Sequence, residues 1–136
     1  MNFTAAFGMP PRKGSTKARP LSSGRRSPCP VACSLDIFGD KWTLLVIRDL
    51  MLGRTRFKDF AGSPEGIPTN ILAERLERLL EAEMIETTPA HEGARRLAYR
   101  LTKKGTALAP IIRAVRDWGL KWEKGTRTDI ARVSVK

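Results

Sequence analysis

The stretch GSPEGIPTNILAERLERLLEA, residues 62–82, decides the fold. Its first five residues combine Gly, Ser and Pro, which predicts a tight turn. Pro68 suits the first position of a helix, and we expect this helix to run through Ala82. Three further leucines fall within about 80° of Leu72 on one face: Leu76, Leu79 and Leu80. Polar residues fall opposite: Asn70, Glu74, Glu77 and Glu81. One face is therefore expected in the core and the other is available for contacts.

Three helices and a short extended piece are expected before this stretch: helices over residues 31–38, 41–52 and 57–61, and the extended piece over residues 54–56. Pro30 suits the first position of the first helix, which makes Cys29 its N-cap. Asp40 is expected to cap the second helix. Gly39 and Gly53 are expected to end these two helices.

A β-hairpin and a long helix are expected after the stretch. The hairpin consists of a strand over residues 84–88, a turn over residues 91–94 and a strand over residues 96–101. In the second strand we expect Leu97, Tyr99 and Leu101 to point inward, and Arg96, Ala98 and Arg100 outward. Thr102 is expected to cap a helix that continues to about Lys121. Its apolar residues recur at steps of three and four, which predicts a seam for another helix: Leu108, Ile111, Val115, Trp118 and Trp122.

The charge of the chain is strongly positive. Its 136 residues include 25 Lys and Arg against 14 Asp and Glu, a net charge of +11. Residues 1–28 hold six basic side chains and no acidic one: Arg12, Lys13, Lys17, Arg19, Arg25 and Arg26. We expect residues 1–28 to be a basic disordered tail, residues 29–123 one folded domain, and residues 124–136 a second basic tail. A chain this basic is expected to bind a polyanion, nucleic acid before membrane.

Several classes of protein do not fit the sequence. The longest aliphatic run is residues 44–47, far too short for a membrane span. Two cysteines, Cys29 and Cys33, cannot hold together a secreted mini-protein, and we expect a cytoplasmic protein. One histidine, His91, in an expected turn leaves no set of nucleophile and base, so neither an enzyme, a cofactor nor a metal site is expected.

This order of elements is typical of a winged helix-turn-helix, a mainly α fold with a small β-hairpin (α+β). In that fold the second helix of the motif enters the major groove of double-stranded DNA, and the hairpin reaches the neighbouring backbone or minor groove. Asn70 is suited to adenine and Glu74 to cytosine. For Arg75, an ion pair with an acid such as Glu65 is the alternative to a DNA contact. The residues expected at DNA are Arg54, Arg56, Lys58, Thr69, Asn70, Glu74, Arg75, Arg78, Arg95 and Arg96.

Blocks of residues in the same order resemble the HxlR-type bacterial transcriptional regulators, a MarR-like family. The blocks are CPVA at residues 29–32, LDI at 35–37, GDKWTLLVIRDL at 39–50, GIPTNILAERL at 66–76, YRLTKKG at 99–105 and RDWG at 116–119. The resemblance covers roughly Cys29 to Trp122. Two positions depart from the family: Glu83 stands where glycine is usual at the end of the groove helix, and Pro68 replaces a small N-cap residue.

The resemblance implies a homodimer that binds a palindromic operator, more often to repress than to activate. It implies that the first and last helices form the dimer interface, which agrees with the seam on the last helix. The interface residues expected on this basis are Val31, Leu35, Leu108, Ile111, Val115, Trp118 and Trp122. In some members the cysteine that matches Cys29 senses oxidants or electrophiles. A helix N-terminus beside a basic tail favours a thiolate there, and a helix-start residue without a sensing role is the alternative.

A second class of function also fits the charge. A basic architectural protein would coat nucleic acid without sequence preference. That interpretation explains the charge, but it does not explain why a patterned groove helix is separate from the basic tail. Competition between operator-like palindromes and random DNA distinguishes the two.

Overall fold

A computed structural model of the chain describes residues 24–129. Residues 1–23 and 130–136, which contain most of the two expected basic tails, lie outside the described residues. Two compact units make up the described chain, residues 24–40 and residues 41–129. Among the described residues, no helix is long and apolar enough to cross a membrane.

The first unit contains helix α2, Pro30–Phe38. As expected, Cys29 is its N-cap, Pro30 begins the helix and Gly39 ends it, with the Gly39 N–H donating to Leu35 O at 2.7 Å. No residue of α2 is buried within the chain. Its apolar side chains are therefore available to another surface.

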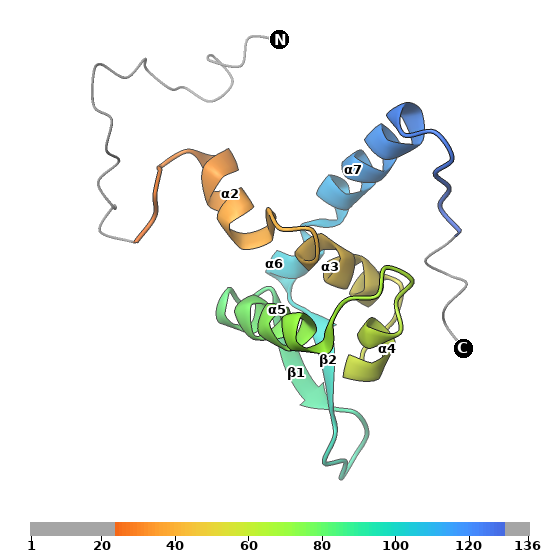
Figure 1. The fold of residues 1–136 in the computed structure, drawn as a ribbon. Helices are drawn as coiled ribbons and strands as arrows, with labels where there is room; N and C mark the ends of the chain where they lie inside the picture. The colour runs from red at the N-terminus through yellow and green to blue at the C-terminus, as the bar shows by residue number, and fades with distance from the viewer. Residues whose placement is uncertain (1–23, 130–136) are drawn as a thin grey trace. The chain divides into compact units, whose positions relative to one another are not determined.

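The second unit is a winged helix-turn-helix, as the order of elements predicted (Figure 1). Its elements are α3 (Thr43–Met51), α4 (Phe57–Ala61), α5 (Thr69–Glu81), β1 (Ile85–Pro89), β2 (Leu97–Leu101), α6 (Lys103–Thr106) and α7 (Ala109–Trp122). The two strands pair antiparallel, from Ile85 opposite Leu101 to Pro89 opposite Leu97, and they form the wing. Helix α3 begins at Thr43 with Trp42 at the N-cap, so Asp40 is not the cap expected there.

The core of this unit joins α3, α4, α5 and the base of the wing. Its most buried apolar side chains include Ile47, Phe60, Leu72, Leu76, Leu79 and Ile85. Phe60 packs edge-to-face against Tyr99 of β2, with ring centroids 6.1 Å apart. The Tyr99 N–H also donates to Thr55 O at 2.7 Å, which attaches the extended piece before α4 to the wing. The apolar face expected for the helix over residues 68–82, which is α5, thus lies at the centre of the core.

The inward face expected for the second strand was partly wrong. Ala98 is buried at 8% exposure, whereas Leu97, expected to point inward, is 52% exposed. Tyr99 and Leu101 are half-buried and Arg100 is exposed, as expected for those positions. Leu97 lies at the outer end of β2, opposite Pro89, where the hairpin extends beyond the core. Alternation in the sequence therefore could not show how far along the wing the core reaches.

The single long helix expected after Thr102 is two helices. Thr102 caps α6, accepting from the Gly105 N–H at 3.1 Å as expected, but the chain breaks at residues 107–108 before α7 begins. Pro110 explains the break, because it has no N–H and its ring clashes with the carbonyl four residues earlier in a continuous helix. Leu108 is only 6% exposed. It belongs to the core, so its assignment to the dimer interface was wrong.

Helix α5 ends in a Schellman motif at an unusual residue. Met84 N–H donates to Leu79 O at 2.9 Å and Glu83 N–H donates to Leu80 O at 3.0 Å. The motif requires a left-handed residue between them, and Glu83 has φ +59°. The helix therefore stops where a glycine would end it, despite the side chain at that position.

Candidate DNA interface

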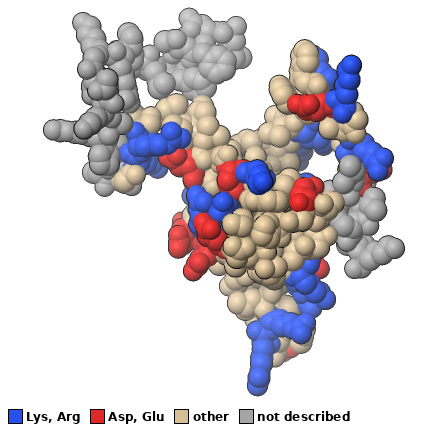
Figure 2. Space-filling model, in the orientation of Figure 1, with Lys and Arg blue, Asp and Glu red and all other residues tan. Residues whose placement is uncertain are grey.

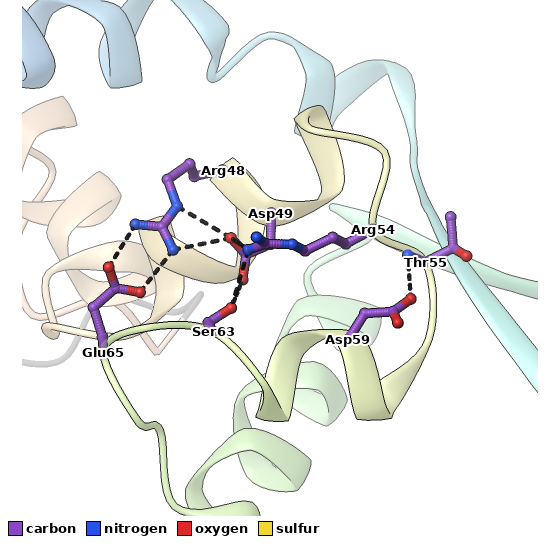
Figure 3. Close-up of polar contacts among 7 residues, drawn as sticks. All are labelled: Arg48, Asp49, Arg54, Thr55, Asp59, Ser63 and Glu65. Carbon is purple, nitrogen blue, oxygen red and sulfur yellow. Dashed lines mark hydrogen bonds and ion pairs between the residues drawn. The ribbon is translucent and has the colours of Figure 1, made fainter. Parts of the chain in front are cut away.

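The interface is built on a buried polar network that the sequence did not suggest (Figure 3). Asp49 on α3 accepts hydrogen bonds from Arg54 Nη1 at 2.7 Å and from the Ser63 hydroxyl. Arg54 Nη1 also lies 3.2 Å from Ser63 Oγ. Arg54 and Asp49 are 3% and 2% exposed. The DNA contact expected for Arg54 is therefore wrong, because its guanidinium neutralises a buried carboxylate instead.

A second arginine extends this network to the turn before α5. Arg48 donates to both oxygens of Glu65, at 3.0 and 2.7 Å, and also to Asp49 at 2.9 Å. The hydrogen bond from Arg48 lowers the pKa of Glu65. Burial alone would lower the pKa of Arg48, but its bonds to the two carboxylates outweigh that effect and raise it. The alternative partner expected for Arg75, Glu65, is thus bound by Arg48.

The network fixes the helix-turn-helix to the helix behind it. Asp49 and Arg48 belong to α3, whereas Ser63 and Glu65 belong to the turn between α4 and α5. Ion pairs with several hydrogen bonds hold one geometry, because breaking one partner leaves a buried charge unpaired. These side chains are positioning residues for α5 rather than DNA contacts. The sequence signal that could have revealed them is Asp49 itself, a charged residue among the apolar positions of α3.

The start of α5 is exposed and has no side-chain cap. Pro68 is the N-cap and makes no capping hydrogen bond, and Thr69 and Asn70 are both exposed. The first amides of a helix have no partner within it, and they attract phosphate oxygens. Glu74 and Arg78 are also exposed, further along the helix. Arg75 is less open, since its side chain is 14% exposed and Nη1 lies 2.9 Å from Glu74 Oε1.

Arginines converge where the wing meets the extended piece before α4. Arg56, His91, Arg95 and Arg96 line a hollow of about 360 Å³. Figure 2 shows Lys and Arg side chains gathered over the wing. Arg56 is half-buried at the N-cap of α4, where its N–H donates to Asp59 Oδ2 at 3.1 Å. Lys58 is exposed on α4. Three arginines expected at DNA therefore line one hollow, although Arg56 is 39 and 40 residues away from Arg95 and Arg96 in the chain.

The residues expected at a dimer interface are apolar and open in each unit, apart from Leu108. Val31 and Leu35 on α2 are 43% and 47% exposed. On α7, exposure runs from 39% to 62% at the following side chains: Ile111, Val115, Trp118 and Trp122. No residue of α7 is buried. An apolar stripe this open is typical of a surface that another chain covers.

Both cysteines are free thiols at the start of α2. Cys29 is half-buried, and its N–H donates to Ser27 Oγ at 3.1 Å. Cys33, one turn further along, is half-buried as well, and its Sγ donates to Ser27 O at 3.1 Å. The thiol of Cys33 therefore has a hydrogen-bond partner, whereas Cys29 occupies the N-cap without using its side chain as a cap.

Comparisons with known proteins agree with this geometry. Residues 37–127 match the profile of the family described as HxlR-like helix-turn-helix. The transcriptional regulator YodB of Bacillus subtilis is 34% identical over 91 residues, which cover 66% of this chain and 81% of YodB. The structure of PA1607, described as a transcription factor, superposes with a TM-score of 0.70 at 40% identity, covering 79% of this chain and 76% of PA1607. The redox regulator HypR in its reduced form gives a TM-score of 0.61 at 27% identity, covering 68% and 91% of the two chains.

The solved forms of YodB bear on the role of the cysteines. YodB has been solved in reduced, diamide-treated and quinone-bound forms. The chain spans between 56% and 82% of the length of curated relatives that it matches, and these relatives are helix-turn-helix regulators.

Proposed function

The chain belongs to the HxlR-like helix-turn-helix family of transcriptional regulators, and we propose that it is a homodimeric repressor that reads a palindromic operator with α5 and the wing. The observation that carries this proposal is the joint exposure of two surfaces. One is the uncapped start of α5, with Thr69 and Asn70. The other is the arginine-lined hollow of the wing. Base edges in the major groove and phosphates beside it are the complementary partners.

The two surfaces have different tasks in this proposal. Asn70 and Glu74 read base edges, because an amide can pair with adenine in two places and a carboxylate accepts from cytosine. Arg56, Arg95 and Arg96 bind phosphates, and their contribution falls as salt is added. Lys58 and Arg78 are placed on the flanking backbone, and Arg75, bound by Glu74, orients that carboxylate rather than contacting a base.

Selection of bound duplexes from a random library tests this function. We expect a palindromic site to be enriched, with half-sites about one helical turn apart. Asn70→Ala should then lose about 1–3 kcal/mol for the selected site and relax the preference at one position. Arg96→Gln should weaken binding to all sequences alike and reduce the salt slope by about one. Enrichment of no sequence would instead support the architectural protein that coats DNA.

Arg100→Gln is the matched control for Arg96→Gln. It removes the same charge from the same hairpin, but Arg100 Nε already binds Glu86 Oε1 at 2.7 Å on the outer side of β2. We expect it to leave affinity and salt slope nearly unchanged. Equal effects of the two variants would show that the charge of the wing, rather than its hollow, binds DNA.

We further propose that oxidants or electrophiles regulate the repressor through Cys29. The thiol adds across the activated carbon–carbon bond of a quinone, forming a C–S bond, and its proton passes to the ring oxygen of the resulting hydroquinone. With diamide, Cys29 and a cysteine of the second copy each lose a hydrogen, a disulfide forms, and the N=N bond is reduced to the hydrazine. A bond between Cys29 and Cys33 of one copy, one helical turn apart, would be strained.

Mass spectrometry and operator binding, measured together, test this regulation. We expect diamide or quinone to modify Cys29 and to change operator affinity in the parent, and Cys29→Ser to abolish the response. Cys33→Ser is the control for the quinone response, which it should leave unchanged, because it removes only the neighbouring thiol that binds Ser27 O. A Cys29→Ser protein that still responds would overturn the sensing role.

The basic residues before the described region are proposed to add affinity without sequence preference. Four of them lie in residues 1–23: Arg12, Lys13, Lys17 and Arg19. Deletion of residues 1–23 keeps Ser27, which contacts both cysteines. We expect this deletion to lower the salt slope and leave the selected sequence unchanged. An unchanged slope would remove this role.

A further inference from the structure

A groove of about 530 Å³ lies on the second unit, away from the wing. The end of α3 and the turn residue Glu65 form one side, and α7 with the segment after it forms the other. Apolar side chains such as Leu52 and Ile112 line much of it, and arginines stand around them: Arg48, Arg113, Arg116 and Arg127. A concave, largely apolar site with a few convergent charged groups is typical of small-molecule binding sites.

The charges of the groove favour an anion. Four arginines face one acidic residue, Glu65. Arg116 and Arg127 pair with exposed aspartates outside the groove, at 2.9 and 3.0 Å. The Arg113 side chain makes no hydrogen bond or ion pair with any residue that the structure describes. A ligand carboxylate would therefore meet at least one guanidinium without having to displace an acid.

Arg48 shows which anion suits the site. Its guanidinium already binds the two oxygens of the Glu65 carboxylate, at 3.0 and 2.7 Å, in the two-point geometry that carboxylates and guanidinium groups share. Glu65 is thus a carboxylate held at the edge of the groove, and a ligand carboxylate is its chemical equivalent. The apolar lining indicates that the remainder of the ligand is hydrocarbon.

The groove and the exposed apolar stripe occupy different faces of α7. At 100° per residue, Ile111, Val115 and Trp118 lie close to one direction, whereas Ile112, Arg113 and Arg116 lie about 100–200° around the helix from Ile111. A second copy packed on the stripe would therefore not occupy the direction in which the groove faces.

We propose that this groove binds a small apolar monocarboxylate, with its carboxylate on Arg113 and Arg48 and its hydrocarbon part on the apolar lining. Bound there, the carboxylate competes with Glu65 for Arg48. Glu65 belongs to the turn between α4 and α5, and Arg48 also binds Asp49 of the buried network. The ligand thus removes one of the ion pairs that hold the turn to α3. Loss of this ion pair is expected to change operator affinity, and this second step rests on the proposed function.

Calorimetry with the full chain, without DNA, tests the site. The probe is 2-naphthoate, and 2-naphthamide is its uncharged counterpart of the same shape. We expect saturable binding of the acid, about tenfold or more tighter than the amide, because a charge-assisted hydrogen bond contributes at least that much. Equal binding of the two, or no saturable binding of the acid, would overturn the proposal.

Three variants make the result specific. Arg113→Gln should weaken 2-naphthoate binding about tenfold, whereas Arg100→Gln, which removes a charge from the wing, should not weaken it. Glu65→Gln should bind the acid more tightly, because the competing carboxylate is gone. If 2-naphthoate binds Arg113→Gln as tightly as the parent, the proposed site is wrong. If it binds Glu65→Gln no more tightly than the parent, the proposed competition with Glu65 is wrong. Thermal melts of each variant confirm that it is folded.

The regulatory step has its own readout. We expect 2-naphthoate to change operator affinity by about fivefold or more in the parent, an ordinary coupling between two sites, and not in Arg113→Gln. Binding of the acid without this change would overturn the coupling and leave the site. A chain that prefers no DNA sequence would overturn the proposed function, while calorimetry would still decide the site.

Discussion

Helices α5 and α7 have nearly the same length, 13 and 14 residues, and both carry an apolar stripe. Helix α5 buries its stripe within the chain, with Leu72, Leu76 and Leu79 each at most 2% exposed. Helix α7 buries none of its residues and leaves Trp118 and Trp122 60% and 62% exposed. An amphipathic pattern therefore indicates that a face will be covered, but it does not indicate by which chain.

The largest effect is expected from shortening the stripe of α5. Leu76→Ala should destabilise the protein by about 2–5 kcal/mol, because it leaves a cavity in a core that cannot close around it. Urea denaturation at low protein concentration measures this loss. Val115→Ala on α7 is the control, since that side chain is 55% exposed and should cost much less under the same conditions. Equal losses would mean that α7 is packed within a single chain.

The next effect is expected on association rather than folding. Trp118→Ala should weaken the proposed dimer by about 2 kcal/mol, roughly 30-fold, because buried tryptophans carry much of the energy of an interface. Sedimentation equilibrium measures the change. Leu120→Ala is the control, because Leu120 is 44% exposed on the same helix but lines the groove. A parent chain that stays monomeric, or two variants of equal effect, would contradict the interface.

The same comparison shows how much of the fold could be predicted. The leucine spacing of α5 predicts both the helix and its buried face, because the leucines at helical spacing are the residues that the core buries. The spacing of residues 108–122 predicted a helix correctly and its start wrongly. The steps of three and four include Leu108, but Pro110 forces a new helix to begin at Ala109. Local backbone chemistry thus overrode a side-chain pattern that continues across the break.

The candidate site was predictable where a residue acts by itself. Thr69 and Asn70 are exposed at the start of α5, as a polar face predicts. Arg54 was assigned by charge, and charge alone does not reveal a partner. Arg54 donates to the carboxylate of Asp49, five residues earlier in the chain, and to the hydroxyl of Ser63, which follows α4. Only the folded chain brings these three side chains together, so the positioning network could not be inferred from spacing.

A smaller effect is expected at the end of α5. Glu83→Gly should stabilise the protein by about 0.5–1 kcal/mol. A left-handed conformation costs a residue with a side chain about 1–2 kcal/mol, and the greater conformational freedom of glycine in the unfolded chain offsets part of what the substitution gains. Glu81→Gly, two residues earlier and inside the helix, should instead cost about 1 kcal/mol. Urea denaturation of both variants checks the opposite signs. Destabilisation by Glu83→Gly would show that the side chain makes contacts that outweigh the strain.

The smallest effect concerns the ion pair of Arg48 and Glu65, which joins α3 to the turn before α5 at the edge of the groove. The hydrogen bond from Arg48 lowers the pKa of Glu65 below its ordinary value of 4.5 in the folded chain. A carboxylate whose pKa is lowered by folding contributes stability that is fully present above its ordinary pKa. This stability is lost as pH falls through the pKa of the folded state. Thermal melts between pH 7 and pH 3 should therefore show Glu65→Gln less stable than the parent at pH 7, with the difference disappearing at acid pH. Glu77→Gln, on the exposed face of α5, should melt as the parent does at each pH. A difference for Glu65→Gln that stays constant down to pH 3 would mean that the glutamate side chain acts by packing and that its charge does not hold the turn.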